Sequence, residues 1–192
     1  MIATLRRLTL LCFALCALGA QAAEHPRVKL ETDQGVILVE LYPEKAPKSV
    51  ANFLAYVDSG FYDKTIFHRV IRNFVIQGGG MDATMREKPT RAPIANEAKN
   101  GLKNEVGTLA MARTSDPNSA SSQFFINLRN NSNLDYPSFD GWGYAVFGKV
   151  VEGLAIVQKI SRVQTGTVGP MEDVPKTPVV LKTARRVAAA KK

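Results

Sequence analysis

Residues 67–79 read Phe-His-Arg-Val-Ile-Arg-Asn-Phe-Val-Ile-Gln-Gly-Gly. Two segments rich in apolar residues, 66–70 and 74–77, overlap this stretch, and each predicts a short β-strand. Arg69 lies inside the first run, although burying a charge is costly unless the charge is paired. Alternation along a strand groups Arg69 with Phe67 on one face. Arg69 therefore has either a function in a site or a place on a solvated face, with or without an aspartate as its partner, and this stretch alone leaves both interpretations open.

The sequence on both sides of this stretch predicts further short strands and two helices. Asp33-Gln34-Gly35, between two β-branched runs, indicates a hairpin, because Gly35 can take a positive φ. Pro47 opens a helix with one apolar face, and Gly60 ends it. A second short helix follows Gly153. Strands are expected at 28–32, 36–41, 66–70, 74–77, 108–112, 123–126, 144–150 and 179–183.

This order of elements predicts the fold class. Many short strands with two helices favour a closed β-barrel or sandwich with helical additions over an alternating parallel α/β sheet. Three long stretches fit neither helix nor strand, namely 78–107, 113–122 and 127–143. Long connections without secondary structure are usually functional loops in a compact domain. Because each one follows a predicted strand, we expect the three loops to cluster around one face.

The first 22 residues have the features of a secretory signal peptide. Arg6 and Arg7 precede the apolar run Leu8–Leu18, and Ala20-Gln21-Ala22 supplies a small-x-small cleavage site. The run is shorter than the ~20 residues that span a bilayer. We therefore favour a cleaved signal over an uncleaved membrane anchor. The mature protein is expected in the periplasm, with no membrane association after cleavage.

Both cysteines of the chain, Cys12 and Cys16, lie in this segment. The predicted mature chain therefore offers neither a structural disulfide nor a cysteine nucleophile. We divide it into one domain, 23–183, and a basic C-terminal tail, 184–192. The formal net charge of the full chain is +8, but Lys and Arg are dispersed except at the C-terminus. This pattern favours a soluble basic surface over a nucleic-acid-binding site.

Histidine is scarce, which limits the chemistry of the chain. His25 and His68 are its two histidines, and His25 lies beside the cleavage site, so a metal site built on His and Cys is not expected. A Ser-His-Asp triad would depend on His68, and no Gly-x-Ser-x-Gly motif is present. Gly78-Gly79-Gly80 lacks the Gly-Lys-Ser/Thr that completes a phosphate-binding loop. We therefore expect no metal and no cofactor.

Several segments with intact spacing resemble those of one family. They are Phe67-His68-Arg69-Val70, Phe74–Gly79, Met111-Ala112-Arg113, Ser122–Ile126, Leu134-Asp135 and Phe147–Val150. Together they are similar to the cyclophilins, most closely to the exported bacterial members, from about Val28 to Val180. The resemblance implies a closed eight-stranded antiparallel β-barrel with two capping α-helices. It also implies peptidyl-prolyl cis-trans isomerase activity, in a groove on the outer surface of the barrel.

The resemblance further implies roles for individual residues. It assigns catalysis to Arg69, together with Gln77 and His68. For His68 we prefer a packing and hydrogen-bonding role over that of a proton donor. Gln77 and the backbone of Arg113 are expected to hold the peptide groups of the substrate. Substrate-binding residues are implied at Phe74, Val75, Ala112, Arg113, Phe125, Leu134 and Tyr144.

The implied substrates are proline-containing polypeptides that are unfolded or partly folded. We expect a monomeric enzyme that accelerates the folding of exported proteins and binds no nucleic acid. A proline-binding chaperone with incidental catalysis is the alternative. The presence of Arg69 and Gln77 argues against it, since binding alone needs only the apolar pocket.

Four positions depart from the pattern that is frequent in the family. Val75 stands where Met is frequent, Arg113 where Asn is frequent, and Tyr144 where His is frequent. Asn133 stands where many eukaryotic members carry Trp. We expect these differences to affect substrate preference and inhibition by the cyclic peptide cyclosporin, rather than activity itself.

Overall fold

The structure, a computed structural model, describes residues 25–187. The predicted signal peptide, 1–22, lies outside these described residues. The elements, in chain order, are β1 (Arg27–Thr32), β2 (Val36–Leu41), α1 (Pro47–Asp58), β3 (Thr65–Phe67), β4 (Arg69–Ile71), β5 (Val75–Gly78), the 3-10 helix η1 (Ala98–Asn100), β6 (Thr108–Met111), β7 (Phe124–Asn127), the 3-10 helix η2 (Ser132–Leu134), β8 (Val146–Glu152), α2 (Leu154–Ile160), β9 (Thr165–Val168), β10 (Met171–Pro175) and β11 (Val179–Val187).

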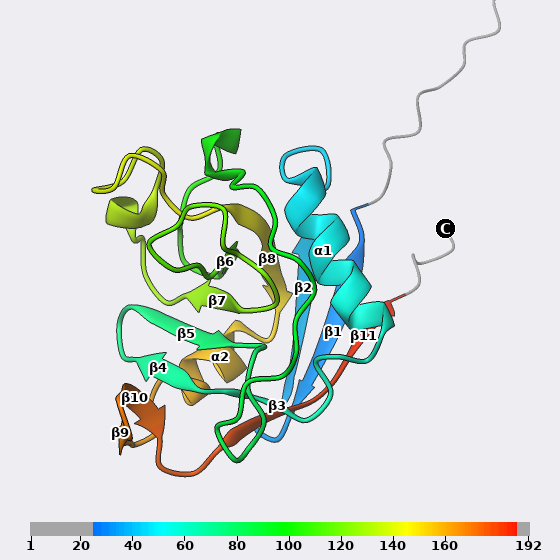
Figure 1. Cartoon of the computed structure of the whole chain (residues 1–192). Coiled ribbons are helices and arrows are strands. Elements are labelled where there is room, and N and C mark those ends of the chain that lie inside the picture. The colour runs from blue at the N-terminus through cyan, green and yellow to red at the C-terminus, as the bar shows by residue number, and fades with distance from the viewer. Residues whose placement is uncertain (1–24, 188–192) are drawn as a thin grey trace, which may run out of the picture.

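Nine of these strands form one antiparallel sheet, in the order β3-β11-β1-β2-β8-β6-β7-β5-β4. β3 and β4 stand at the two ends of this order, yet only His68 separates them along the chain. The sheet therefore curls into a nearly closed barrel (Figure 1). The predicted mainly β barrel with two helices is confirmed. Nine strands replace the predicted eight because the strand expected at 66–70 divides at His68.

The division at His68 also decides the face on which Arg69 lies. Phe67 and Val70 are both buried in the main core, whereas Arg69 is half-buried and lines a cavity outside that core. Strict alternation along one strand would have grouped Arg69 with Phe67. That expectation was wrong, because the interruption at His68 shifts the alternation by one residue.

The two helices pack on different sides of the barrel and share one core (Figure 1). α1 starts at Pro47, and Gly60, with a φ of +67°, follows its end, as predicted. Phe53 on α1 is fully buried. Its ring centroid lies 5.2–5.4 Å from those of three other buried rings, Tyr62, Phe124 and Phe147. Each such pair stabilises the fold by about 0.5–1.5 kcal/mol beyond its area burial.

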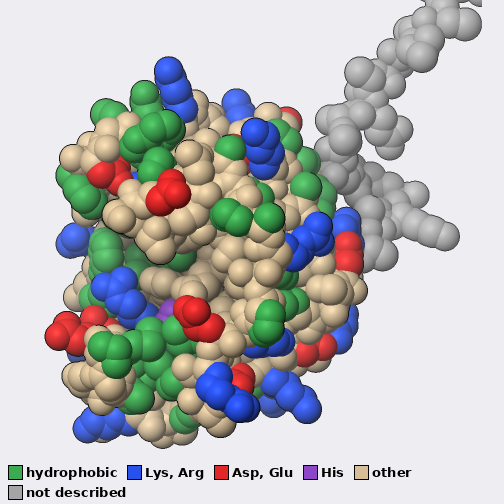
Figure 2. All heavy atoms as spheres, viewed as in Figure 1, with side chains coloured by type: hydrophobic (Ala, Val, Ile, Leu, Met, Phe, Trp, Pro, Cys, Tyr) green, Lys and Arg blue, Asp and Glu red, His purple; other side chains and the backbone are tan. Residues whose placement is uncertain are grey.

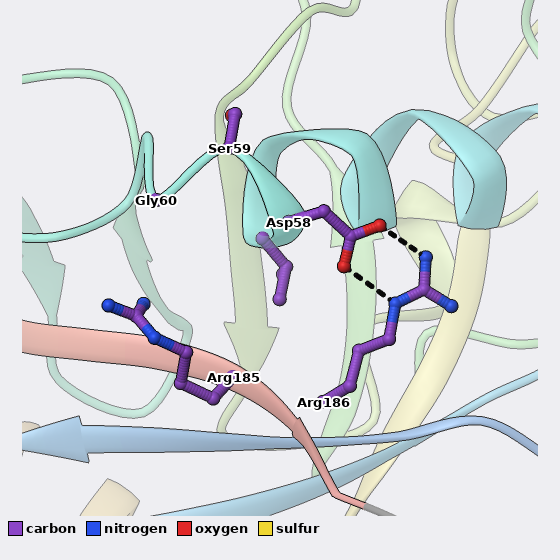
Figure 3. Close-up of a pocket in the computed structure, with 6 residues that line it drawn as sticks. Asp58, Ser59, Gly60, Arg185 and Arg186 are labelled. Atoms are coloured by element: carbon purple, nitrogen blue, oxygen red, sulfur yellow. Dashed lines mark hydrogen bonds and ion pairs between the residues drawn. The ribbon is translucent and has the colours of Figure 1, made fainter.

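The C-terminal part differs from the prediction in two respects. β9 and β10 form a separate hairpin that the sequence did not reveal, because most residues of these strands are half-buried or exposed and the strands lack an apolar alternation. β11 continues to Val187, so residues 184–187 belong to the sheet rather than to the predicted tail. Arg185 pairs with Asp63 at 2.6 Å, and Arg186 pairs with Asp58 at the end of α1 (Figure 3). Both ion pairs hold the last strand against α1 and the turn that follows it.

The three stretches predicted as loops contain two 3-10 helices and isolated bridges. They meet one another, as expected. Ile94 N donates to Ala120 O at 2.9 Å, and Asn96 Nδ2 donates to Gly143 O at 3.2 Å. Within residues 25–187, no helix is both long enough and apolar enough to cross a membrane.

Candidate active site

The barrel strands bury apolar side chains on both of their faces. On β7, Phe124 and Ile126 belong to the main core, while Phe125 between them belongs to a second, smaller cluster. Alternation separates Ile76 from Val75 on β5 in the same way. The second cluster consists of Val75, Ala110, Phe125, Leu134 and Val146, with Phe74, Leu102, Ala112 and Tyr144 packed against it. Because this cluster lies on the opposite face of the strands from the core, it is available as the floor of a binding site.

A cavity of about 110 Å³ opens on this cluster. Nine of the ten predicted site residues line it, namely Arg69, Phe74, Val75, Gln77, Ala112, Arg113, Phe125, Leu134 and Tyr144. Segments that are far apart in the sequence are therefore brought to one place by the fold. Figure 2 shows this side of the molecule hollowed near its middle, with hydrophobic, basic and acidic side chains around the hollow.

A row of cross-strand partners forms one side of the cavity. Arg69 pairs with Gln77 across β4 and β5, and Gln77 pairs with Phe125 across β5 and β7. Directly opposite residues have Cβ atoms ~4.5–5.5 Å apart, so a guanidinium, an amide and an aromatic ring are neighbours. Gln77 Nε2 donates to Gln123 Oε1 at 3.0 Å, which orients the amide. Gln123 was not predicted as a site residue, because nothing in its strand pattern distinguishes it.

Arg69 carries its charge without an acidic partner among residues 25–187. The nine salt bridges within this range do not include Arg69. The pairing with an aspartate that the solvated-face interpretation allowed is therefore absent from residues 25–187. Arg69 lines the cavity, where it is available to a ligand.

His68 is the predicted site residue that does not line the cavity. It is 2% exposed at the junction of β3 and β4, and its Nδ1 has no hydrogen-bond partner among the described residues. Burial lowers the pKa of His68 to about 4, and the nearby charge of Arg69 acts in the same direction. The geometry therefore fits the packing role rather than a place among the catalytic groups. In the described range, no group of three or more His, Cys, Asp or Glu side chains could hold a metal ion.

Buried amides position the loop residues that complete the cavity. Asn131 Nδ2 donates to Phe74 O at 3.0 Å and to Asn127 Oδ1 at 2.7 Å. Tyr144 N donates to Leu134 O at 2.9 Å, so the two ends of this loop meet at the cavity. Asn131 is 1% exposed, but a buried Asn in a loop looks like any other polar loop residue in sequence. These supporting residues were not predicted.

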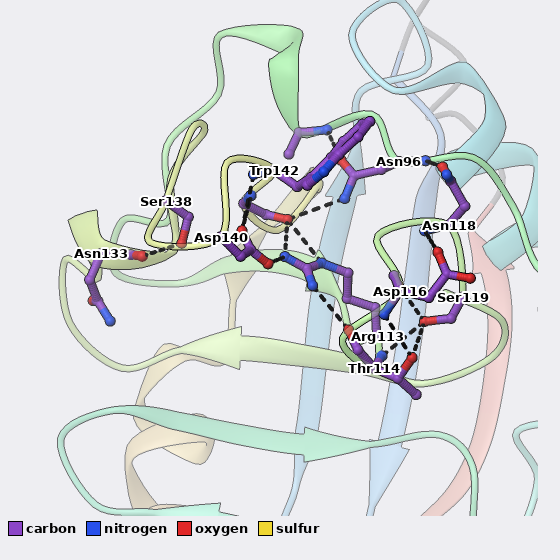
Figure 4. A network of polar contacts seen from close by, with 12 residues as sticks. Asn96, Arg113, Thr114, Asp116, Asn118, Ser119, Asn133, Ser138, Asp140 and Trp142 are labelled. Carbon is purple, nitrogen blue, oxygen red and sulfur yellow. Dashed lines mark hydrogen bonds and ion pairs between the residues drawn. The ribbon is translucent and has the colours of Figure 1, made fainter.

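The side chain of Arg113 reaches from the end of β6 to the loop 135–143 (Figure 4). It is 3% exposed and forms an ion pair with Asp140. Its Nε and Nη2 donate to Gly143 O at 3.1 and 3.0 Å. The guanidinium lies 4.3 Å from the ring centroid of Tyr144. The sequence interpretation considered only the backbone of Arg113, so Asp140 and this network were missed.

Comparison with known proteins identifies the family to which this fold and cavity belong. Residues 27–186 match the family model described as cyclophilin type peptidyl-prolyl cis-trans isomerase. The chain belongs to the cyclophilins. The predicted family is thereby confirmed, and this cyclophilin is a peptidyl-prolyl cis-trans isomerase, an enzyme class that acts on proline-containing peptides.

Named relatives of this cyclophilin cover most of its length. It is 55% identical over 160 residues to a peptidyl-prolyl cis-trans isomerase of Streptomyces antibioticus, covering 82% of this chain and 96% of that protein. It is 52% identical over 169 residues to peptidyl-prolyl cis-trans isomerase A of Dickeya dadantii, covering 88% and 87%. A crystal structure of a Cryptosporidium parvum cyclophilin in the presence of the dipeptide Ala-Pro matches with a TM-score of 0.68 at 28% identity, covering 85% of this chain and 99% of that one.

Proposed function

We propose that this cyclophilin rotates X-Pro bonds with Arg69 as its catalytic residue, and that it serves the folding of exported proteins in the periplasm. One observation supports the catalytic role above all others. Arg69 lines the cavity that opens on the apolar cluster and has no salt-bridge partner among residues 25–187. The cellular role rests on the signal-like pattern of residues 1–22.

The reaction is a rotation, so no covalent bond is made or broken. The C–N bond of a peptide has partial double-bond character, and its rotation barrier is ~18–20 kcal/mol. At X-Pro the cis form lies only ~0.5–1 kcal/mol above trans. Uncatalysed exchange takes ~10–100 s, which is slow enough to limit folding. An enzyme accelerates the exchange when it binds the twisted peptide more tightly than either planar form.

Arg69 supplies an interaction that favours the twisted state. When the bond twists, the proline nitrogen becomes pyramidal and gains a lone pair that the planar amide lacks. A guanidinium at the cavity donates a hydrogen bond to this lone pair. Such a charge-assisted bond contributes about 1.5–3 kcal/mol. Arginine suits this task because its charge is permanent and its donors form a rigid fork.

The remaining cavity residues hold the substrate while the bond rotates. Phe125 and Leu134, with Phe74 and Val75, provide the apolar floor and walls that accept the proline ring. Gln77, oriented by Gln123, holds one peptide group beside the ring, and the backbone of Arg113 holds another. With the ring fixed, the carbonyl group on the other side of the bond is the part that turns.

A coupled isomerisation assay on an Ala-Pro peptide tests the catalytic half of the proposal. We expect the purified protein, residues 23–192, to accelerate cis/trans exchange at catalytic concentrations, with the same rate in the presence of chelator or reductant. Cell fractionation and N-terminal sequencing test the other half. A periplasmic protein that begins near Ala23 supports export, whereas an intact Met1 in the cytoplasmic fraction contradicts it.

A further inference from the structure

The side chain of Arg113 forms a network of contacts that is separate from the substrate-binding role expected of its backbone. Four contacts hold the guanidinium: the ion pair with Asp140, two donations to Gly143 O, and a donation from Nη1 to Thr114 O at 3.0 Å. Asp140 is fixed in turn, because its Oδ1 accepts from Trp142 N at 3.0 Å and from Gly143 N at 3.2 Å. Backbone donation from Trp142 first, and the Arg113 side chain as well, lower the pKa of Asp140 to about 2. The ion pair is therefore intact at every physiological pH.

The same guanidinium supports a wall of the proline pocket. It lies 4.3 Å from the ring centroid of Tyr144, and that ring forms a T-shaped pair with Phe125, with centroids 5.8 Å apart. Phe125 and Tyr144 both line the cavity. A chain of contacts thus runs from Asp140 through Arg113 and Tyr144 to the floor of the pocket. Stacking of a desolvated guanidinium on an aromatic ring fixes the plane of that ring.

The backbone next to Tyr144 is held just as closely. Gly143 has a φ of +72°, and a Cβ atom there would lie 2.6 Å from Tyr136 N. Gly143 O accepts from Asn96 Nδ2 as well as from Arg113. Tyr144 N donates to Leu134 O. The loop 135–143 is therefore anchored at its C-terminal end, next to Tyr144 of the cavity (Figure 4).

We propose that the Arg113–Asp140 pair is a positioning device that sets Tyr144 as a wall of the proline pocket and thereby sets the affinity for the substrate. Arg113 acts through Tyr144 rather than on the rotating bond. The inference rests on the proposed function, since it takes the cavity as the proline-binding site. A wall contacts the proline ring equally in the planar and the twisted peptide, so it contributes uniform binding. Loss of uniform binding raises KM and leaves kcat unchanged.

Steady-state kinetics of Arg113→Ala, Asp140→Asn and the double variant test this assignment. We expect Arg113→Ala to raise KM for an Ala-Pro peptide about tenfold, with kcat within about twofold of the parent. Asp140→Asn, which keeps an acceptor for the backbone N–H groups, is expected to raise KM about threefold. The double variant should match Arg113→Ala alone, because contacting residues of one network are not additive.

Two controls separate positioning from general stabilisation. Arg186→Ala breaks another Arg–Asp pair, that with Asp58, and is expected to keep the parental KM. Trp142 is the one tryptophan of the chain, and its backbone N–H donates to Asp140. Its emission maximum therefore reports on this loop and should shift in Asp140→Asn but not in Arg186→Ala. If Arg113→Ala does not fold, Tyr144→Ala takes its place and should give the same rise in KM.

Parental KM in a folded Arg113→Ala or Tyr144→Ala enzyme would overturn the proposal. A fall in kcat at constant KM would also overturn it, because Arg113 would then act on the twisted state. Failure of the proposed catalytic role gives a different result. In that case Arg69→Ala keeps its kcat, while the KM effect of Arg113→Ala can still be measured.

Discussion

Arg69 and Gln77 are directly opposite partners across β4 and β5, and the row continues through Phe125 on β7. The hydrogen-bond register of the barrel, rather than a loop, therefore sets the spacing between the proposed catalytic cation and the amide that holds the substrate. A slip of one residue in β4 would turn Arg69 toward the core and Val70 toward the cavity. The burial of Val70 in the main core opposes such a slip.

Arg69→Ala is expected to lower kcat by about one to two orders of magnitude, which corresponds to a lost transition-state contact of ~1.5–3 kcal/mol. The thermal midpoint should stay close to the parental value, since no salt bridge within residues 25–187 is removed. Arg72→Ala is the matched control, because Arg72 is exposed after β4 and does not line the cavity. The measurement is a coupled isomerisation assay beside a melting curve. Near-parental kcat in a folded Arg69→Ala enzyme would refute the mechanism.

Asn131→Ala is expected to destabilise the fold by about 1–3 kcal/mol, because it leaves Asn127 Oδ1 buried without its donor, whereas Phe74 O still accepts from Leu128 N. KM should rise as well, since Asn131 holds Phe74 at the cavity. Urea unfolding measures the free energy. The exposed neighbour Ser132 serves as a control, and Ser132→Ala should change stability by less than about 0.5 kcal/mol. Equal stability of the two variants contradicts the role given to the buried amide.

His68 makes stability, but not activity, sensitive to acid. Its pKa is about 4 in the fold, below the ordinary value of 6.5, chiefly because of burial. Between these values the unfolded chain binds more protons, so stability falls as the pH falls from 6.5 to 4, by up to about 3 kcal/mol. Above pH 6.5 this contribution is fully present.

Urea titrations at pH 7 and pH 4.5 measure this effect in the parent and in His68→Leu. The pH difference in stability should be smaller in the variant by about 2–3 kcal/mol. The parental kcat should be flat from about pH 6 to 8, because the proposed rotation uses no group as a general acid or base. A bell-shaped profile centred in that range would show instead that a histidine titrates during catalysis.

Cyclosporin is expected to inhibit this enzyme weakly. Asn133 is exposed in η2, directly before Leu134 of the cavity, where sensitive members of the family carry Trp. Asn offers a donor but lacks the apolar face of an indole. Losing ~1.5–3 kcal/mol of contact weakens binding by about one to two orders of magnitude. Trp142, half exposed on the same loop, does not line the cavity and does not replace the missing ring.

Inhibition assays on Asn133→Trp test this assignment. The variant should be about ten- to a hundredfold more sensitive than the parent, with an unchanged kcat for the Ala-Pro peptide. Trp142→Ala should leave sensitivity at the parental level. Tight inhibition of the parent, or no gain in Asn133→Trp, would show that another residue occupies the position of the family's Trp.

Local patterns in the sequence predicted most elements of the barrel, because each pattern depends on neighbours a few residues away. The hairpin at Gly35, the helix between Pro47 and Gly60, and the apolar strand 123–126 all follow from turn chemistry and periodicity. The separate hairpin of β9 and β10 lacks such a pattern, and the sequence did not predict it. The resemblance of motifs supplied the ten candidate residues, nine of which meet at one cavity.

The sequence by itself determined the family, most strands of the barrel and the residue types of the cavity, since these are written in short motifs with fixed spacing. Only the tertiary structure decided the face of Arg69, the exclusion of His68 from the cavity and the pairing of Arg113 with Asp140. The interruption between β3 and β4 results from closing the barrel, and the alternation of side chains along a strand does not predict it. Arg113 and Asp140 lie on different loops, so their contact exists only when β6 and β8 pair and bring those loops together.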